Sequence, residues 1–263
     1  MDLSLTQTLV LCGFVFIGGF VDSIAGGGGL ITLPAYFAMG LPAHAALATN
    51  KFSSVCGTSF AVLRYWRAGT VSARVGLPAA AGALFGSAIG AKIALVVPAS
   101  VINTVMLVLV PAVLVFLLLK DRLFAPPSAS AAAQHGWVSL QPSALRLWSL
   151  LIGLVIGAYD GFFGPGTGTF LAIAFSAFLG LDLLAASGNA RVANLASNLG
   201  SVVVFLASAK VLFPLALYTA AAGICGNLLG SRLAVQKGAR VIKPLMVVVL
   251  LLLMAEVVRR RYW

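Results

Sequence analysis

The sequence predicts an all-α integral membrane protein in which eight to ten hydrophobic helical segments form two homologous repeats. The first observation behind this prediction is composition: 61% of the 263 residues are hydrophobic and only 9% are charged, whereas an ordinary soluble domain has roughly 25% charged residues. The second is a succession of long apolar stretches, and the third is a repeat of the first half of the chain in the second half. With a mean hydropathy of +1.07, we expect the chain to be surrounded by a lipid bilayer.

The long apolar stretches are near the roughly 20 residues that a spanning helix needs. They cover residues 3–21, 75–97, 101–119, 145–156 and 244–258. The first four residues lack the basic region of a signal peptide, so we expect the first helix to be retained. The 17 basic residues are scattered over short loops and helix ends. This distribution fits the positive-inside bias of membrane proteins better than a surface for nucleic acid.

The internal repeat appears when the second half is aligned with the first. Residues 19–29 match residues 157–167 at an offset of 138, and after a two-residue insertion the offset is 140. The matched pairs include Asp22 with Asp160, Gly40 with Gly180, Lys51 with Arg191, Gly86 with Gly226, Gly90 with Gly230, and Lys92 with Arg232. We therefore divide the chain into repeat one (1–120), a flexible polar linker (121–144) and repeat two (145–263).

The second apolar segment of each half is short, covering residues 30–41 and 169–181. Such a segment rises about 18 to 20 Å as a helix, less than the roughly 30 Å hydrocarbon core. Each follows a glycine-rich run, which predicts a broken or re-entrant helix. If the short segment counts as a crossing, the repeats are inverted, and otherwise they are parallel. With inverted repeats 9 of the basic loop residues lie inside and 4 outside, and with parallel repeats 10 lie inside and 3 outside. The positive-inside bias therefore does not distinguish the two arrangements. We expect inverted repeats, because short broken helices at matching positions of two halves are typical of membrane proteins built from inverted repeats.

The glycine runs are candidate ligand sites because they bring bare N–H groups to the start of a helix, an arrangement that favours an anion. The candidate residues are Gly26, Gly27, Gly28, Gly29, Gly164, Gly166 and Thr167. A hinge or a tight helix crossing without a ligand is the alternative. Neither run fits a nucleotide fingerprint.

Asp22 and Asp160 end predicted spanning helices directly before these runs. A charged group at membrane depth costs about 2.5 to 3.5 kcal/mol on insertion scales, so its recurrence calls for a reason. Each acid could be a protonatable carboxylate that couples transport to a proton, or a partner for a nearby cation. The alternative is a cap for the helix that follows.

Each half has one cation deep within the predicted helix that follows its short segment. Lys51 follows Asn50 directly, and Arg191 lies two residues after Asn189. We expect these four residues to contact the anion. The alternative is that Asp22 or Asp160 balances the cations structurally.

Lys92 and Arg232 lie nearer helix ends, where long side chains reach the interface. Four candidate cations and two acids give a tally of +2 in or near the membrane region, a balance that would attract anions.

Other polar residues give weaker signals. Asn194, Ser197 and Asn198 could line a path or bond a neighbouring helix. Gly82, Gly86 and Gly90 lie four residues apart and predict close helix packing. No catalytic triad, paired-carboxylate site or His/Cys cluster occurs, and Cys12, Cys56, Cys225, His44 and His135 have no paired or metal-ligand spacing. We therefore expect no enzyme, cofactor or metal.

The paired motifs give the chain a family resemblance. Gly-Phe-Val-Asp-Ser-Ile-Ala-Gly-Gly-Gly-Gly with Ala-Thr-Asn-Lys in the first half, and Tyr-Asp-Gly-Phe-Phe-Gly-Pro-Gly-Thr-Gly with Asn-Ala-Arg in the second, resemble the TauE/SafE sulfite exporter family over nearly the whole chain. The resemblance implies a multi-pass permease of the bacterial cytoplasmic membrane that exports sulfite, sulfoacetate or a related anion.

The leading hypothesis is a secondary transporter of a small anion, with a coupling proton or ion as a possible partner. An anion uptake permease of other specificity and a membrane assembly protein that transports nothing are the alternatives.

Overall fold

The computed structural model describes residues 3–123 and 141–237, and this part of the chain is helical without strands. The first half contains α1 (Leu5–Ala25), α2 (Gly29–Ala38), α3 (Ala43–Arg67), α4 (Ala73–Val96) and α5 (Ala99–Leu123). The second half contains α7 (Pro142–Phe162), α8 (Thr167–Leu179), α9 (Leu183–Ala207) and α10 (Leu215–Lys237). The all-α prediction is confirmed.

The two short segments are helices α2 and α8, of 10 and 13 residues. The predicted segment 244–258 lies outside the described residues, as does most of the predicted linker, since α5 extends to Leu123 and α7 begins at Pro142. On length and composition alone, α1, α4, α7 and α9 can each cross a membrane. α3 is as long as α9 but contains more charge, including Lys51, which is buried inside the bundle.

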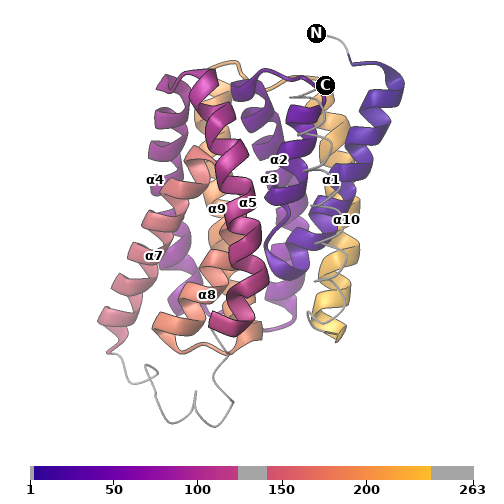
Figure 1. Ribbon diagram of the computed structural model, residues 1–263. Coiled ribbons are helices and arrows are strands. Elements are labelled where there is room, and N and C mark those ends of the chain that lie inside the picture. The colour runs from indigo at the N-terminus through magenta and orange to yellow at the C-terminus, as the bar shows by residue number, and fades with distance from the viewer. Residues whose placement is uncertain (1–2, 124–140, 238–263) are drawn as a thin grey trace.

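The two halves are inverted relative to each other. In Figure 1, α1 begins at the upper end of the bundle, and the short helix α2 lies toward that same end. The equivalent helix α7 begins at the lower end, where α8 also lies. Each short helix therefore returns toward the face from which its preceding helix entered, and the re-entrant prediction for both segments agrees with this arrangement.

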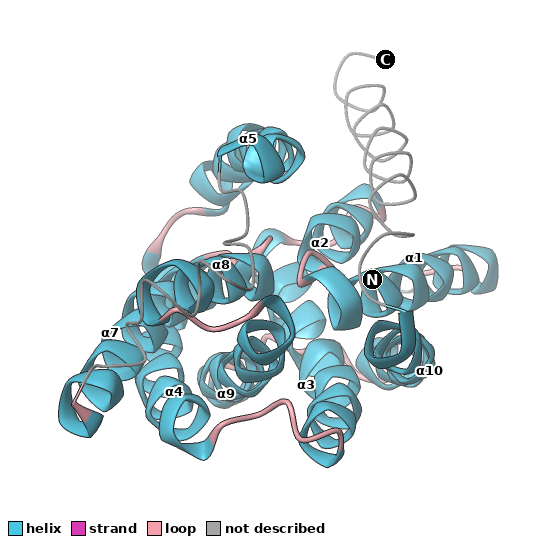
Figure 2. Ribbon diagram, turned by 90° about the horizontal axis from the view of Figure 1, so that it is seen from below, coloured by secondary structure: helices cyan, strands magenta, loops and turns pink. Residues whose placement is uncertain are grey.

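The packing of the helices follows the same symmetry. α1 packs against α10 and α7 against α4, while α3 and α9 contact each other and also α10 and α4 respectively. Figure 2 shows the α4–α7 pair at one end of the bundle and the α1–α10 pair at the other, with α3 and α9 between them. Exchanging the halves exchanges these two pairs.

Glycines allow both of these pairs to pack backbone against backbone. A Cβ built on Gly86 of α4 would lie 2.1 Å from the carbonyl oxygen of Leu154. One built on Gly226 of α10 would lie 2.1 Å from the carbonyl oxygen of Phe16, the residue that the repeat aligns with Leu154. The stripe of small residues is therefore a packing surface, as its spacing predicted.

The helix breaks are caused by glycines in the left-handed conformation. Gly26, with φ of 82°, ends α1, and its N–H donates to the carbonyl oxygen of Asp22. Gly164 and Gly166, with φ of 97° and 83°, separate α7 from α8. An L side chain is strained at these angles, so the glycines hold each break next to its acid.

The packing predicts opposite effects for two glycine-to-alanine substitutions. Gly86→Ala puts a methyl group against a carbonyl of α7, and overpacking of this kind costs about 1–3 kcal/mol. Gly13→Ala in α1 has nothing within 4 Å of the new Cβ and gains roughly 0.5–1 kcal/mol of helix propensity. Thermal unfolding of the purified protein in detergent is expected to show a lower midpoint for Gly86→Ala and an unchanged or higher one for Gly13→Ala.

The inverted arrangement predicts opposite exposure of two equivalent loops. Ala68 follows α3, Lys210 follows α9, and both are exposed. In a cysteine-free background, Ala68→Cys is expected to react with a membrane-impermeant maleimide from the cytoplasm, because Arg64, Arg67 and Arg74 surround it. Lys210→Cys is expected to react from outside. Labelling of both positions from one side would contradict inversion.

Candidate functional site

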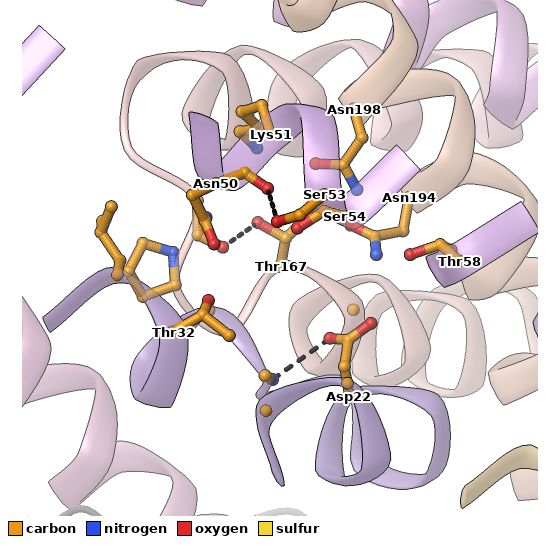
Figure 3. Close-up of a pocket in the computed structure, with 18 of the residues that line it drawn as sticks. Asp22, Thr32, Asn50, Lys51, Ser53, Ser54, Thr58, Thr167, Asn194 and Asn198 are labelled. Carbon is orange, nitrogen blue, oxygen red and sulfur yellow. Dashed lines mark hydrogen bonds between the residues drawn. The ribbon is translucent and has the colours of Figure 1, made fainter. Parts of the chain in front are cut away.

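A cavity lies between the two repeats and is lined by residues of both. Repeat one contributes Asp22 of α1, Thr32 of α2 and five polar residues of α3 to its lining. The five are Asn50, Lys51, Ser53, Ser54 and Thr58. Repeat two contributes Asp160 of α7, Thr167 of α8, Asn194 and Asn198 of α9, and Asn227 of α10. Figure 3 shows most of these side chains converging from helices far apart in the sequence.

The first of two ion pairs joins Lys51 to Asp160. The Lys51 Nζ lies 2.6 Å from Asp160 Oδ2, and the side chains are 4% and 3% exposed. Thr167 Oγ1 donates to Asp160 Oδ1 at 2.8 Å, and Ser197 Oγ donates to Oδ2. The Asp160 carboxylate therefore has three side-chain donors and is shielded from water.

The second ion pair joins Arg191 to Asp22. The Arg191 Nη1 lies 3.3 Å from Asp22 Oδ2, and the backbone N–H of Gly28 donates to Asp22 Oδ1 at 3.2 Å. Arg191 is 1% exposed, whereas Asp22 is 17% exposed. Asp22 thus both pairs with a cation and caps the start of α2, two of the roles expected from its position.

Both ion pairs cross from one repeat to the other. Lys51 of repeat one pairs with the acid of repeat two, and Arg191 of repeat two pairs with the acid of repeat one. The alternative in which the carboxylates balance the deep cations is therefore the arrangement in the structure. Two cations and two acids leave these pairs with no net formal charge.

The tally of +2 for the membrane region does not apply to the cavity, because it counted Lys92 and Arg232, which are not in the lining. Both side chains are exposed rather than directed into the cavity. α4 and α10 turn their glycine faces toward α7 and α1, so their long cations are left on the outer face of the bundle.

The two helix breaks contact each other beside the cavity. A Cβ built on Gly26 would lie 2.4 Å from the carbonyl carbon of Gly168. Thr169 Oγ1 donates to the carbonyl oxygen of Ala25 at 2.5 Å, which ties the first turn of α8 to the end of α1. The starts of α2 and α8, with their positive dipole ends, therefore lie side by side in the middle of the molecule.

Three buried polar atoms in the cavity lining have no hydrogen-bond partner. They are Thr32 Oγ1, Asn50 Oδ1 and Asn227 Oδ1, on side chains 6%, 6% and 3% exposed. An unsatisfied buried polar group costs about 1–3 kcal/mol. A bound ligand or water would satisfy these atoms, so the cavity is a built polar site.

Most candidate residues from the sequence line this cavity. They are Asp22, Gly26, Gly28, Gly29, Asn50, Lys51, Asp160, Gly164 and Thr167. Gly27, Gly166, Asn189 and Arg191 are not in the lining. Arg191 lies directly behind it, bonded to Asp22.

Asn189 and Gly166 are engaged elsewhere. Asn189 Oδ1 accepts from the Ser72 N–H at 3.1 Å and its Nδ2 donates to the Ala185 carbonyl at 2.8 Å, which fixes α9 to the α3–α4 loop. Gly166 faces α5, where a built Cβ would lie 2.8 Å from Val113 Cγ1.

The polar lining residues that were not predicted from the sequence are Thr32, Ser53, Ser54, Thr58 and Asn227. A signal for two of them was available. Ser54 and Thr58 lie on the same helix face as Asn50, and the repeat aligns them with Asn194 and Asn198 of α9. Asn227 aligns with Ser87 and has no such counterpart.

His44 lies outside the cavity lining and has structural contacts. His44 Nε2 lies 3.1 Å from the carbonyl oxygens of both Ala94 and Val97 at the end of α4. Within residues 3–123 and 141–237, no cluster of three His, Cys, Asp or Glu side chains could hold a metal.

Inverted repeats, helices broken at matching positions and a polar cavity between them define the chain as a multi-pass membrane transporter. The chain belongs to the sulfite exporter TauE/SafE family, whose model matches residues 10–257. Its bacterial relatives agree with an inner-membrane, multi-pass protein.

Three relatives are described as probable membrane transporter proteins. ORF9 of Sinorhizobium sp. is 38% identical over 94% of this chain and 91% of its own length. A Haemophilus influenzae protein is 31% identical over 100% and 99%, and YfcA of Escherichia coli K12 is 34% identical over 91% and 85%. No solved structure matches the chain.

The crossed pairs predict non-additive effects of substitution on stability. Lys51→Met leaves the buried Asp160 carboxylate without its cation, and breaking a buried pair costs about 3–5 kcal/mol. Lys51→Met with Asp160→Asn removes both charges and is expected to recover much of this loss, since the Asn Oδ1 can still accept from Thr167 while its Nδ2 can donate to the Ser197 hydroxyl. Thermal unfolding in detergent measures the cycle. Lys92→Met, on an exposed side chain, is the control and is expected to have little effect.

Proposed function

We propose that this protein exports a small sulfur-containing oxyanion, such as sulfite or sulfoacetate, through the cavity between its repeats. The observation that carries the proposal is the cavity lining, where two helix starts meet and hydroxyl and amide side chains of both repeats converge. The family description supports the class of anion. Sulfonate and sulfite oxygens accept hydrogen bonds, which is the chemistry that this lining offers.

The hydroxyl and amide groups of the cavity lining are hydrogen-bond donors for such an anion. Ser54 and Thr58 lie on α3, and Asn194 and Asn198 lie opposite on α9. These neutral donors can each donate a hydrogen bond to an oxygen of the anion. The dipoles of α2 and α8 add positive potential at the same place.

The charge of the anion still requires compensation at membrane depth. Lys51 and Arg191 are occupied by Asp160 and Asp22 in this conformation. If one of these acids takes up a proton, its cation becomes available to the anion. The proposal therefore includes a coupling proton on Asp22 or Asp160, and direct contact of Lys51 or Arg191 with the anion during transport.

Flux in proteoliposomes tests the proposal. Purified protein is expected to accelerate the movement of labelled sulfite and sulfoacetate over that of protein-free vesicles. Lys51→Ala combined with Arg191→Ala is expected to abolish this flux. Absence of flux for either anion, or flux unchanged in the double variant, would contradict the proposed site.

Conservative substitutions in the lining are expected to weaken apparent affinity. Thr58→Val removes one donor at nearly constant volume, and one hydrogen bond contributes about 0.5–1.5 kcal/mol, which corresponds to roughly a two- to tenfold rise in KM. Thr104→Val makes the same change on the exposed part of α5 and is the matched control, expected to leave KM unchanged. Initial rates of sulfite flux against concentration measure both.

A further inference from the structure

The two ion pairs are equivalent by repeat, yet the protein holds their carboxylates differently. Asp160 is 3% exposed and accepts from Lys51, Thr167 and Ser197. Asp22 is 17% exposed, lies 3.3 Å from its cation and accepts otherwise from the Gly28 N–H at 3.2 Å. Both acids line the cavity, but Asp160 is fixed by three side-chain donors, whereas Asp22 is more exposed and has a single side-chain partner.

Divergence between the repeats causes this difference. Thr167 aligns with Gly29 at the offset of 138, and Ser197 aligns with Gly57 at the offset of 140. Repeat one therefore has glycine at both positions from which a hydroxyl bonds Asp160. Gly57 also has no space for a side chain, since a built Cβ would lie 2.4 Å from Asn227 Nδ2.

The charged and titratable groups around Asp22 permit a change of its charge state. Arg191 approaches from α9, and Lys51 of α3 acts on Asp22 at longer range. Tyr65 of α3 lies near and donates its hydroxyl to the Ser23 carbonyl at 3.0 Å. Arg191 Nε has no hydrogen-bond partner, so the guanidinium has an unused donor beside the cavity.

On the basis of the proposed function, we propose that Asp22 alone takes up the coupling proton, while the Lys51–Asp160 pair stays closed as a fixed tie between the repeats. A proton from water on the open side binds Asp22 Oδ2, and the Arg191 charge is then balanced by the arriving anion. When the anion leaves on the other side, the proton leaves with it and the Asp22–Arg191 pair reforms. One proton accompanies each anion, so a sulfoacetate dianion crosses with one net negative charge, and the inside-negative membrane potential of a cell drives its export.

Proteoliposomes with labelled sulfoacetate and an internal pH dye test this assignment. The wild type is expected to accumulate sulfoacetate inside alkaline vesicles, with about one proton entering per anion. Asp22→Asn is expected to keep exchange of labelled for unlabelled sulfoacetate and to lose gradient-driven accumulation by at least tenfold. Accumulation that persists in Asp22→Asn overturns the inference, whereas absence of any sulfoacetate flux in the wild type speaks against the proposed function instead.

Chemical labelling of the wild type tests the same assignment independently of flux and of whether a variant folds. Dicyclohexylcarbodiimide reacts with protonated carboxyl groups in apolar surroundings, and mass spectrometry identifies the modified residue. Asp22 is expected to be modified and Asp160 to remain unmodified. Equal or preferential modification of Asp160 overturns the inference.

A matched variant tests the cause of the difference. Thr167→Val with Ser197→Ala removes the two hydroxyl donors of Asp160 and keeps Lys51 in place. This variant is expected to make Asp160 reactive toward the carbodiimide while accumulation of sulfoacetate still depends on Asp22. If Asp160 stays unreactive, the hydroxyls are not what distinguishes the two acids.

Discussion

Two buried ion pairs that cross between the repeats are the constraint on which the rest of this structure depends. Each cation pairs with a carboxylate of the other half of the chain, so separating the halves would leave all four charges without partners. A buried charge without a partner is strongly destabilising. The pairs therefore hold the halves together at the level where both short helices begin, and they fix the position of the cavity.

The broken helices are compatible with this constraint because glycine ends each spanning helix within the bundle. Gly26 and Gly164 turn the chain beside an acid, and the two breaks then pack on each other. Irregular backbone is tolerated at this depth when protein or a polar cavity satisfies it. The site is thus a consequence of how two interrupted helices meet.

The helix packing is symmetric between the two repeats, whereas the surroundings of their acids are not. The packing of α1 on α10 reproduces that of α7 on α4, down to the carbonyls that face Gly86 and Gly226. The scaffold has kept the repeat because close backbone contact accepts few alternatives to glycine. The hydroxyls around Asp160 have no counterpart around Asp22, and this is where the two halves acquire distinct environments.

The sequence by itself determined the helical membrane class, the repeat, the short helices, and the acids and cations that matter, because hydrophobic length and duplicated polar residues are local signals. It could not determine that Lys51 faces Asp160 rather than an anion, that Asn189 binds a loop, or that Asn227 enters the cavity. Those facts depend on how distant helices pack against each other. Only the tertiary structure decided them, since contacts between the inverted halves leave no pattern along one chain.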